Sequence, residues 1–142
     1  MSTTPLIPSD ISAHVKSTYF RVILPRSEEQ PLTQRYTDNL NGRVAYAFDW
    51  PAINTRIVGL ESPYGNVSAQ FTDEPESFDQ WRRDTKVMFE VDDVSTVLEA
   101  AERHGLKIVQ KLGRTPVAMQ GRFELVPGFV VELITFLSPE QH

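Results

Sequence analysis

The sequence predicts an α+β fold in which two tandem βαβββ modules form a curved mixed sheet around a concave cavity. Three observations predict it: a strand, helix and three-strand order in residues 85–137, the same order in residues 14–72, and similar glycine and proline turn signals in both halves. Two such units suffice to complete a core, whereas solenoids need three or more repeats. We therefore expect a single domain over residues 1–142, with an arm at 1–13 and a linker at 73–84.

The second module has the clearer pattern. Residues 86–91 alternate between apolar and polar side chains, which is typical of a strand with one apolar face. Ser95 is the predicted N-cap of a helix whose apolar residues recur at helical spacing until Gly105, a residue that favours a helix end. Three further strands are predicted, separated by glycine- and proline-containing turns: 106–110, 117–123 and 129–136.

The first module repeats this order. Residues 19–24 alternate like the strand at 86–91, and Leu32, Tyr36 and Leu40 give a short helix a narrow apolar edge before the Asn41-Gly42 stop. Strands are then predicted at 43–50, 53–60 and 67–72.

The segments outside the two modules carry weaker signals. The linker is interpreted as irregular or as one short helix, with Arg82 and Arg83 in solvent and Trp81 either covering the cavity or fastening the halves. The arm at 1–13 is either a loose tail or a segment that lies on a neighbour, which its apolar residues favour slightly.

Composition excludes several classes of site and partner. The chain has no cysteine, so disulfides, thiolate zinc sites and cysteine nucleophiles are excluded. The net charge of −5 is spread along the chain, which argues against nucleic acid or an anionic membrane as partner. No apolar run reaches membrane length and no leader is evident, so we expect a cytoplasmic protein whose partner is a small organic ligand.

Several segments in this order resemble the vicinal oxygen chelate superfamily, which includes glyoxalases, extradiol dioxygenases, methylmalonyl-CoA epimerases, and fosfomycin and bleomycin resistance proteins. The resemblance covers about residues 19–136, and three segments carry most of it: Phe89-Glu90-Val91-Asp92-Asp93-Val94, Gly121-Arg122-Phe123 and Pro127-Gly128-Phe129-Val130-Val131-Glu132-Leu133. It implies a homodimer, because members commonly complete or cover their cavities with a second chain.

The resemblance also implies where a metal ion would lie in the concave cavity. The positions that match the metal-ligand slots are Tyr19, Lys86 and Glu132, with Gln70 as the first-module counterpart of Glu132. Only the glutamate is a good ligand, and a lysine ammonium would repel a divalent ion. We therefore expect no metal ligand set and no cofactor.

The side chains predicted to face the cavity are unusually polar for an interior. We predict that Lys86 and Glu132 face one another, with Glu90 and Tyr19 close enough to pass or stabilise a proton. An ordinary salt bridge is the alternative reading of this pair. Six residues are predicted to contact substrate, although the aromatic ones also suit a plain core: Arg21, Gln70, Met88, Tyr46, Phe48 and Trp50.

The leading functional prediction is a metal-independent small-molecule enzyme of isomerase, cyclase or lyase type that acts on a substrate of natural-product size. The first alternative is a binding protein that sequesters an antibiotic between aromatic walls. The second is a metal-dependent enzyme that is glyoxalase-like or dioxygenase-like. The charged residues at the metal slots favour the metal-independent enzyme, since sequestration requires mainly aromatic residues.

Overall fold

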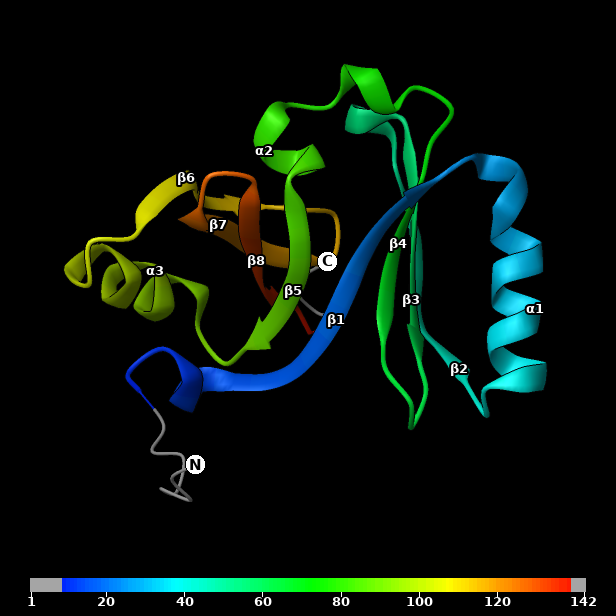
Figure 1. Cartoon of the computed structure of the whole chain (residues 1–142), viewed down its shortest axis with the longest axis horizontal. Helices are drawn as coiled ribbons and strands as arrows, with labels where there is room; N and C mark the ends of the chain where they lie inside the picture. Colours follow the sequence, from blue (N-terminus) through cyan, green and yellow to red (C-terminus); the bar gives the residue numbers. More distant parts are fainter. Residues whose placement is uncertain (1–8, 139–142) are drawn as a thin grey trace.

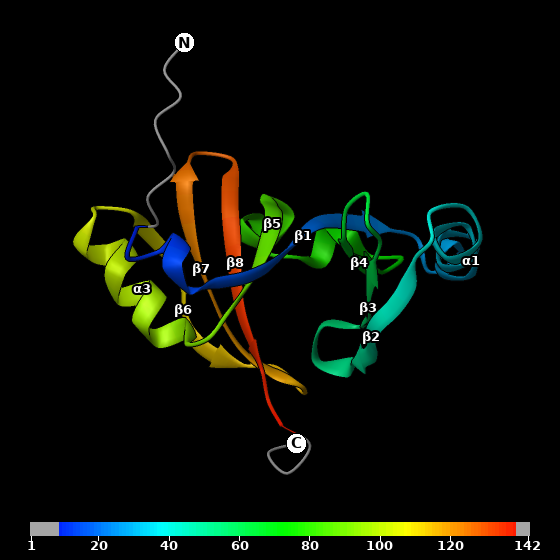
Figure 2. The same cartoon turned by 90° about the horizontal axis from the view of Figure 1, so that it is seen from below.

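A computed structural model describes residues 9–138, which contain a single eight-stranded mixed sheet with strand order β2-β3-β4-β1-β5-β8-β7-β6 (Figure 1). The predicted α+β class is confirmed. Each half of the sheet has a parallel pair at its inner end, β1 with β4 and β5 with β8, and the halves join where β1 runs antiparallel to β5. Figure 2 shows the two halves extending to opposite sides of this central pair.

The first half contains four strands and one helix. They are β1 (Val15–Leu24), α1 (Glu29–Asn39), β2 (Arg43–Trp50), β3 (Thr55–Glu61) and β4 (Val67–Phe71). Leu32 and Tyr36 of α1 pack on a core of strand residues, whereas Leu40, predicted on the same edge, is 39% exposed. Asn41 adopts the left-handed conformation predicted for the end of this helix, with φ of 52°.

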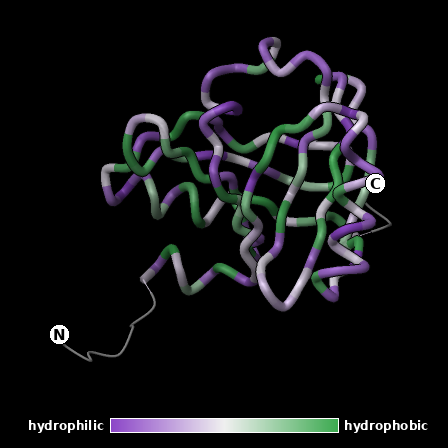
Figure 3. The backbone as a smooth tube through the Cα atoms, turned by 45° about the vertical axis from the view of Figure 1, so that its right-hand side comes forward, coloured by the Kyte–Doolittle hydropathy of each residue, from purple (hydrophilic) through white to green (hydrophobic). Residues whose placement is uncertain are grey.

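The second half repeats the arrangement. Its elements are β5 (Thr85–Val91), α3 (Val94–Arg103), β6 (Lys107–Arg114), β7 (Ala118–Val126) and β8 (Phe129–Phe136). The stripe predicted for the helix is buried on the sheet, and Leu98 packs closely over Gly121, where an added Cβ would lie 2.7 Å from Leu98 Cδ1. Hydrophobic residues gather in the strands, as Figure 3 shows.

The predicted N-cap of α3 is wrong by two residues. Asp93, in extended conformation, accepts hydrogen bonds from the backbone N–H groups of Ser95 and Thr96 and from the Thr96 hydroxyl. Ser95 lies inside the helix, because an aspartate already satisfies the free amides of the first turn.

The linker forms a 3-10 turn at Pro75–Ser77 and the short helix α2 (Gln80–Arg83). The prediction that both arginines are in solvent is correct for Arg83 and wrong for Arg82, which is 6% exposed. The reason is that three aromatic rings surround the Arg82 guanidinium, as described below.

The described part of the arm lies on this chain's own second half. Asp10 binds Arg103 and His104 at the end of α3, and His14 contacts Asp92 at 2.8 Å. Ile11 packs against the core beneath α3. Residues 1–8 of the predicted arm lie outside the described residues.

Within residues 9–138, no helix has both the length and the apolar character needed to cross a membrane.

Candidate functional site

The concave side of the sheet encloses a cavity of about 20 Å³, enough for one water-sized group. Both halves and the linker contribute to its wall. Tyr46 from β2 lines one side, and its ring packs against Phe136 of β8 with ring centroids 5.0 Å apart. The charged and amide side chains of the wall come from strands β1, β4, β7 and β8 and from α2: Arg21, Gln70, Arg82, Gln120 and Glu132.

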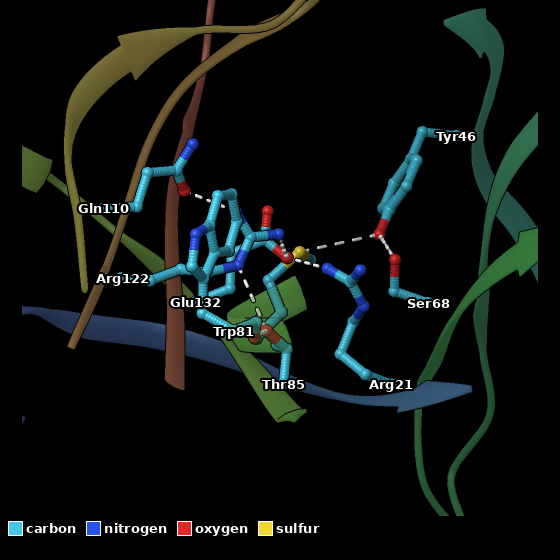
Figure 4. Close-up of polar contacts among 9 residues, drawn as sticks. Arg21, Tyr46, Ser68, Trp81, Thr85, Gln110, Arg122 and Glu132 are labelled. Atoms are coloured by element: carbon cyan, nitrogen blue, oxygen red, sulfur yellow. Dashed lines mark hydrogen bonds and ion pairs between the residues drawn. The ribbon is translucent and has the colours of Figure 1, made fainter. Parts of the chain in front are cut away.

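Glu132 is the central charged group of this wall. It is 4% exposed, and its Oε1 accepts a short hydrogen bond from Arg21 Nη1, so the contact crosses from one half of the sheet to the other (Figure 4). Arg122 Nη2 lies 3.4 Å from the same Oε1. Among residues 9–138, no group hydrogen-bonds Glu132 Oε2. One carboxylate oxygen is therefore held by two cations, whereas the other remains available to a ligand.

Arg122 is fixed from several directions. Its Nε donates to Thr85 Oγ1 at 3.1 Å, its Nη1 donates to Gln110 Oε1, and Trp81 stacks on it at 4.9 Å (Figure 4). Its Nη2 is buried and makes no hydrogen bond within the described chain, like Arg21 Nε and Gln70 Oε1. Buried polar atoms are normally paired. The two arginine nitrogens are therefore donors, and the Gln70 oxygen an acceptor, that a ligand can hydrogen-bond.

Arg82 reaches the cavity from α2. Its guanidinium carbon lies 5.3 Å from the Trp50 ring centroid, 5.7 Å from that of Phe78 and 5.1 Å from that of Trp81. Such stacking stabilises a cation on an aromatic face. Among residues 9–138, the Arg82 side chain forms these ring contacts and no ion pair or hydrogen bond to an oxygen.

Burial acts on all three guanidinium groups, and repulsion by neighbouring arginines acts on Arg21 and Arg122. Desolvation, followed by the positive charge of Arg82, lowers the pKa of Arg21 to about 10. Burial, with the charges of Arg21 and Arg82, holds the pKa of Arg122 well below its ordinary value. Desolvation also lowers the pKa of Arg82, and the negative charge of Asp79 offsets part of this effect. All three shifts have the sign expected for positive groups crowded into a low-dielectric interior.

The aromatic wall is anchored by Tyr46. Its hydroxyl donates to Ser68 Oγ at 2.7 Å, and its ring lies 5.7 Å from the Tyr19 ring and 6.4 Å from the Phe48 ring. Burial raises the pKa of Tyr46 to about 12, so the phenol stays neutral at physiological pH.

The predicted pairing of Lys86 with Glu132 is wrong. The register between β5 and β8 shifts between Thr85 and Val87, so Lys86 falls at the irregularity and its side chain is exposed. Thr85 takes the inward position and accepts the bond from Arg122. Arg21 is the cation that pairs with Glu132 in its place.

Tyr19 and Glu90 lie outside the cavity wall. The Tyr19 hydroxyl donates to Glu61, and burial followed by this bond raises the pKa of Tyr19. Glu90 accepts a hydrogen bond from Ser17 at 2.8 Å. A role for either group in proton transfer stays a prediction.

All six residues predicted to contact substrate do line the cavity, as does Glu132. Whether they bind substrate stays a prediction. Sequence reasoning missed Arg82 and Arg122. Arg122 alternates with Gln120 along β7, and this period-two polar pattern in an apolar strand is a signal that could have identified it. For Arg82, no signal in the sequence distinguishes it from Arg83.

The residues do not fit the divalent ion that the resemblance implies for this fold. The inward positions on the central strands hold Arg21, Gln70, Met88 and Glu132, which together supply one carboxylate and one cation. Within residues 9–138, no three His, Asp or Glu side chains cluster closely enough to hold a metal. Two guanidinium groups already occupy Glu132 Oε1, and they would repel a divalent ion.

No protein-family model matches the sequence, and no curated protein sequence matches it. Several solved structures do match the structure of this chain. Methylmalonyl-CoA epimerase from Mycobacterium tuberculosis is 12% identical with a TM-score of 0.70, and the match covers 96% of each chain.

Two other similar structures have the same arrangement. A Streptomyces coelicolor methylmalonyl-CoA epimerase variant in complex with 2-nitronate-propionyl-CoA is 13% identical over 88% of this chain and 98% of its own, with a TM-score of 0.63. A hypothetical protein from Bacillus halodurans is 14% identical over 87% and 97%, with a TM-score of 0.62. This chain therefore has the fold of the vicinal oxygen chelate proteins.

Proposed function

We propose that the protein is a metal-independent, isomerase-type enzyme that moves a proton on a small organic substrate in the cavity between its two halves. The single observation that carries the proposal is the asymmetric environment of Glu132. Oε1 is held by Arg21 and Arg122, while Oε2 accepts no hydrogen bond within the described chain. A positioned carboxylate with one free oxygen is suited to act as a general base.

The proposed reaction begins when the Glu132 carboxylate takes a proton from a carbon next to a substrate carbonyl. The C–H bond breaks, its electron pair moves to the carbonyl oxygen, and an enolate forms. Arg21, Arg82 and Arg122 line or border the cavity, and their charges stabilise the developing negative charge. Return of the proton from Glu132 to another atom of the enolate completes an isomerisation, and return to the same carbon after exchange with solvent gives the labelled substrate. The fold shared with methylmalonyl-CoA epimerases supports this reaction class.

The test is deuterium incorporation. A panel of small 2-substituted acids and their thioesters is incubated with the protein in D2O and analysed by mass spectrometry and chiral separation. We expect at least one member to gain a single deuterium at the 2-position. Glu132→Asp, which keeps the charge but withdraws the carboxylate, should slow exchange by about 100-fold, because general bases contribute 10²–10⁴-fold and misplacement removes much of that.

Glu102→Gln on the exposed face of α3 is the matched control and should exchange at the wild-type rate. Exchange that is equally fast in Glu132→Asp would contradict the proposed role of this residue. Wild-type protein that binds a panel member tightly without any exchange would support the alternative, a sequestering protein. The aromatic wall of Tyr46, Phe48 and Trp50 favours that second candidate.

A further inference from the structure

The cavity wall and the side chains directly behind it contain more buried positive groups than buried negative ones. Arg21, Arg82 and Arg122 have side chains or whole residues no more than 6% exposed. Glu132 is the single buried carboxylate among residues 9–138. Three guanidinium groups against one carboxylate leave a formal charge of +2, in a chain whose net charge is −5. This local charge is opposite in sign to that of the whole molecule.

Arg82 is the least compensated of the three. Arg21 and Arg122 each contact Glu132, whereas the Arg82 guanidinium makes no ion pair or hydrogen bond within the described chain. The rings of Trp50, Phe78 and Trp81 surround it, and the negative charge of Asp79, at the start of α2, stabilises it without forming an ion pair. A guanidinium carries five N–H donors, and those of Arg82 have no hydrogen-bond acceptor within the described chain, so a ligand can pair with them.

The surrounding rings also fix the direction of this side chain. Arg82 is clamped between residues of β2 and of the linker, and it lines the same cavity as Glu132 and Arg21. Long side chains lose rotamer freedom when they bind a ligand, and a guanidinium that is already immobilised loses less. The arrangement is therefore that of a preorganised receptor for a planar anion.

We propose that Arg82 binds the carboxylate group of the substrate, and that the natural substrates of this site are organic acids. A carboxylate matches the planar fork of a guanidinium and accepts two parallel hydrogen bonds from it. The cavity of about 20 Å³ has room for no more than the anionic group of a ligand. One bound carboxylate reduces the excess charge from +2 to +1. The apolar part of the acid would extend out of the cavity past the rings of Phe48 and Trp50, which line it.

This inference rests on the proposed function for the location of the substrate site, but it is tested without any reaction. Trp50 and Trp81 are the only tryptophans of the chain, and both contact Arg82, so tryptophan fluorescence reports on this site. Full-length protein is titrated with cyclohexanecarboxylate, with the neutral isostere cyclohexanecarboxamide, and with inorganic phosphate. We expect saturable binding of the carboxylate and at least tenfold weaker binding of the amide and of phosphate.

Substitution then assigns the effect to Arg82. Arg82→Met should weaken carboxylate binding at least tenfold and leave amide binding unchanged, and Arg82→Lys should restore part of the loss. Arg83→Met, one residue along the same helix and exposed, is the matched control and should bind the carboxylate like the wild type. If Arg82→Met does not fold, the comparison of carboxylate with amide in the wild-type protein decides the matter.

Each remaining outcome supports or overturns the inference. Equal affinity for the acid and the amide, or unchanged carboxylate binding by folded Arg82→Met, overturns it. Preference for phosphate over the carboxylate overturns the assignment to organic acids. Arg82-dependent carboxylate binding without deuterium exchange supports this inference while the proposed isomerase activity fails. If the protein exchanges neutral substrates and Arg82→Met exchanges them at the same rate, the isomerase activity is supported and the inference about Arg82 is overturned.

Discussion

At the level of the single residue, Gly59 shows how a missing side chain shapes the cavity. The Tyr46 ring lies directly over Gly59 in the neighbouring strand, and a Cβ built there would be 2.1 Å from Tyr46 Cε1. Because Gly59 has no side chain, the Tyr46 ring can lie against β3. There the Tyr46 hydroxyl donates to Ser68 Oγ, and the ring packs against Phe136. The closed side of the cavity therefore depends on the absence of one methyl group.

We predict that Gly59→Ala displaces the Tyr46 ring and lowers the free energy of unfolding by about 1–3 kcal/mol, as overpacked interiors do. The displaced ring loses its contacts with Ser68 and Phe136, so the cavity should become more accessible. Urea unfolding measures the first effect, and quenching of tryptophan fluorescence by acrylamide measures the second.

Gly113→Ala on β6 is the matched control for this substitution. A Cβ there would meet only the Lys111 carbonyl oxygen, at 3.8 Å. Its free energy of unfolding should stay within about 0.5 kcal/mol of wild type. Equal stability of the two glycine variants would show that the Tyr46 ring is not constrained by β3.

At the level of the element, α3 depends on its N-cap. Asp93 bonds two backbone amides and one hydroxyl of the first turn. We predict that Asp93→Ala lowers the free energy of unfolding by about 1 kcal/mol, because the amides of the first helical turn lose their acceptor. Thermal unfolding followed by circular dichroism measures this loss.

Ser95→Ala, two residues further on, is the matched control, since the Ser95 side chain makes no cap bond and alanine favours helix interiors. It should leave the unfolding temperature unchanged or raise it slightly. If Ser95→Ala lowers the unfolding temperature more than Asp93→Ala does, then Ser95 is the N-cap, as the sequence pattern predicts.

At the level of the whole molecule, the pair of Arg21 and Glu132 joins the two halves of the sheet through a buried ionic contact. Glu132→Gln raises the excess charge from +2 to +3, whereas Arg21→Met lowers it to +1. We predict that Glu132→Gln costs about 3–5 kcal/mol of unfolding free energy, the cost of leaving buried charge without its partner. Arg21→Met should cost less, because Arg122 still contacts the carboxylate.

The double variant tests this charge balance. With both groups removed, the excess returns to the wild-type value of +2, so Arg21→Met/Glu132→Gln should be more stable than Glu132→Gln alone. Equilibrium urea unfolding of the four proteins gives the coupling energy. Strictly additive losses would mean that the two side chains do not interact energetically.

Local patterns in the sequence predicted most of the elements. Period-two alternation identified the central strands, helical spacing identified α1 and α3, and the expected order of strands and helices is the observed one. These features depend on neighbours a few residues apart, so the sequence contains them directly. The same parity placed Arg21, Gln70 and Glu132 on the concave face, where they line the cavity.

The composition of the site was decided by contacts between distant parts of the chain. A register shift in β5 moved Lys86 to the surface and placed Thr85 inward, and a strand irregularity of this kind leaves no mark on an alternating pattern. Arg82 and Arg83 are chemically identical neighbours, and only the positions of Trp50, Phe78 and Trp81 bury the first of them. The sequence by itself determined the fold class and the order of elements, because these follow from local periodicity. The tertiary structure alone decided that Arg21 pairs with Glu132, because that contact depends on packing between residues 111 positions apart in the chain.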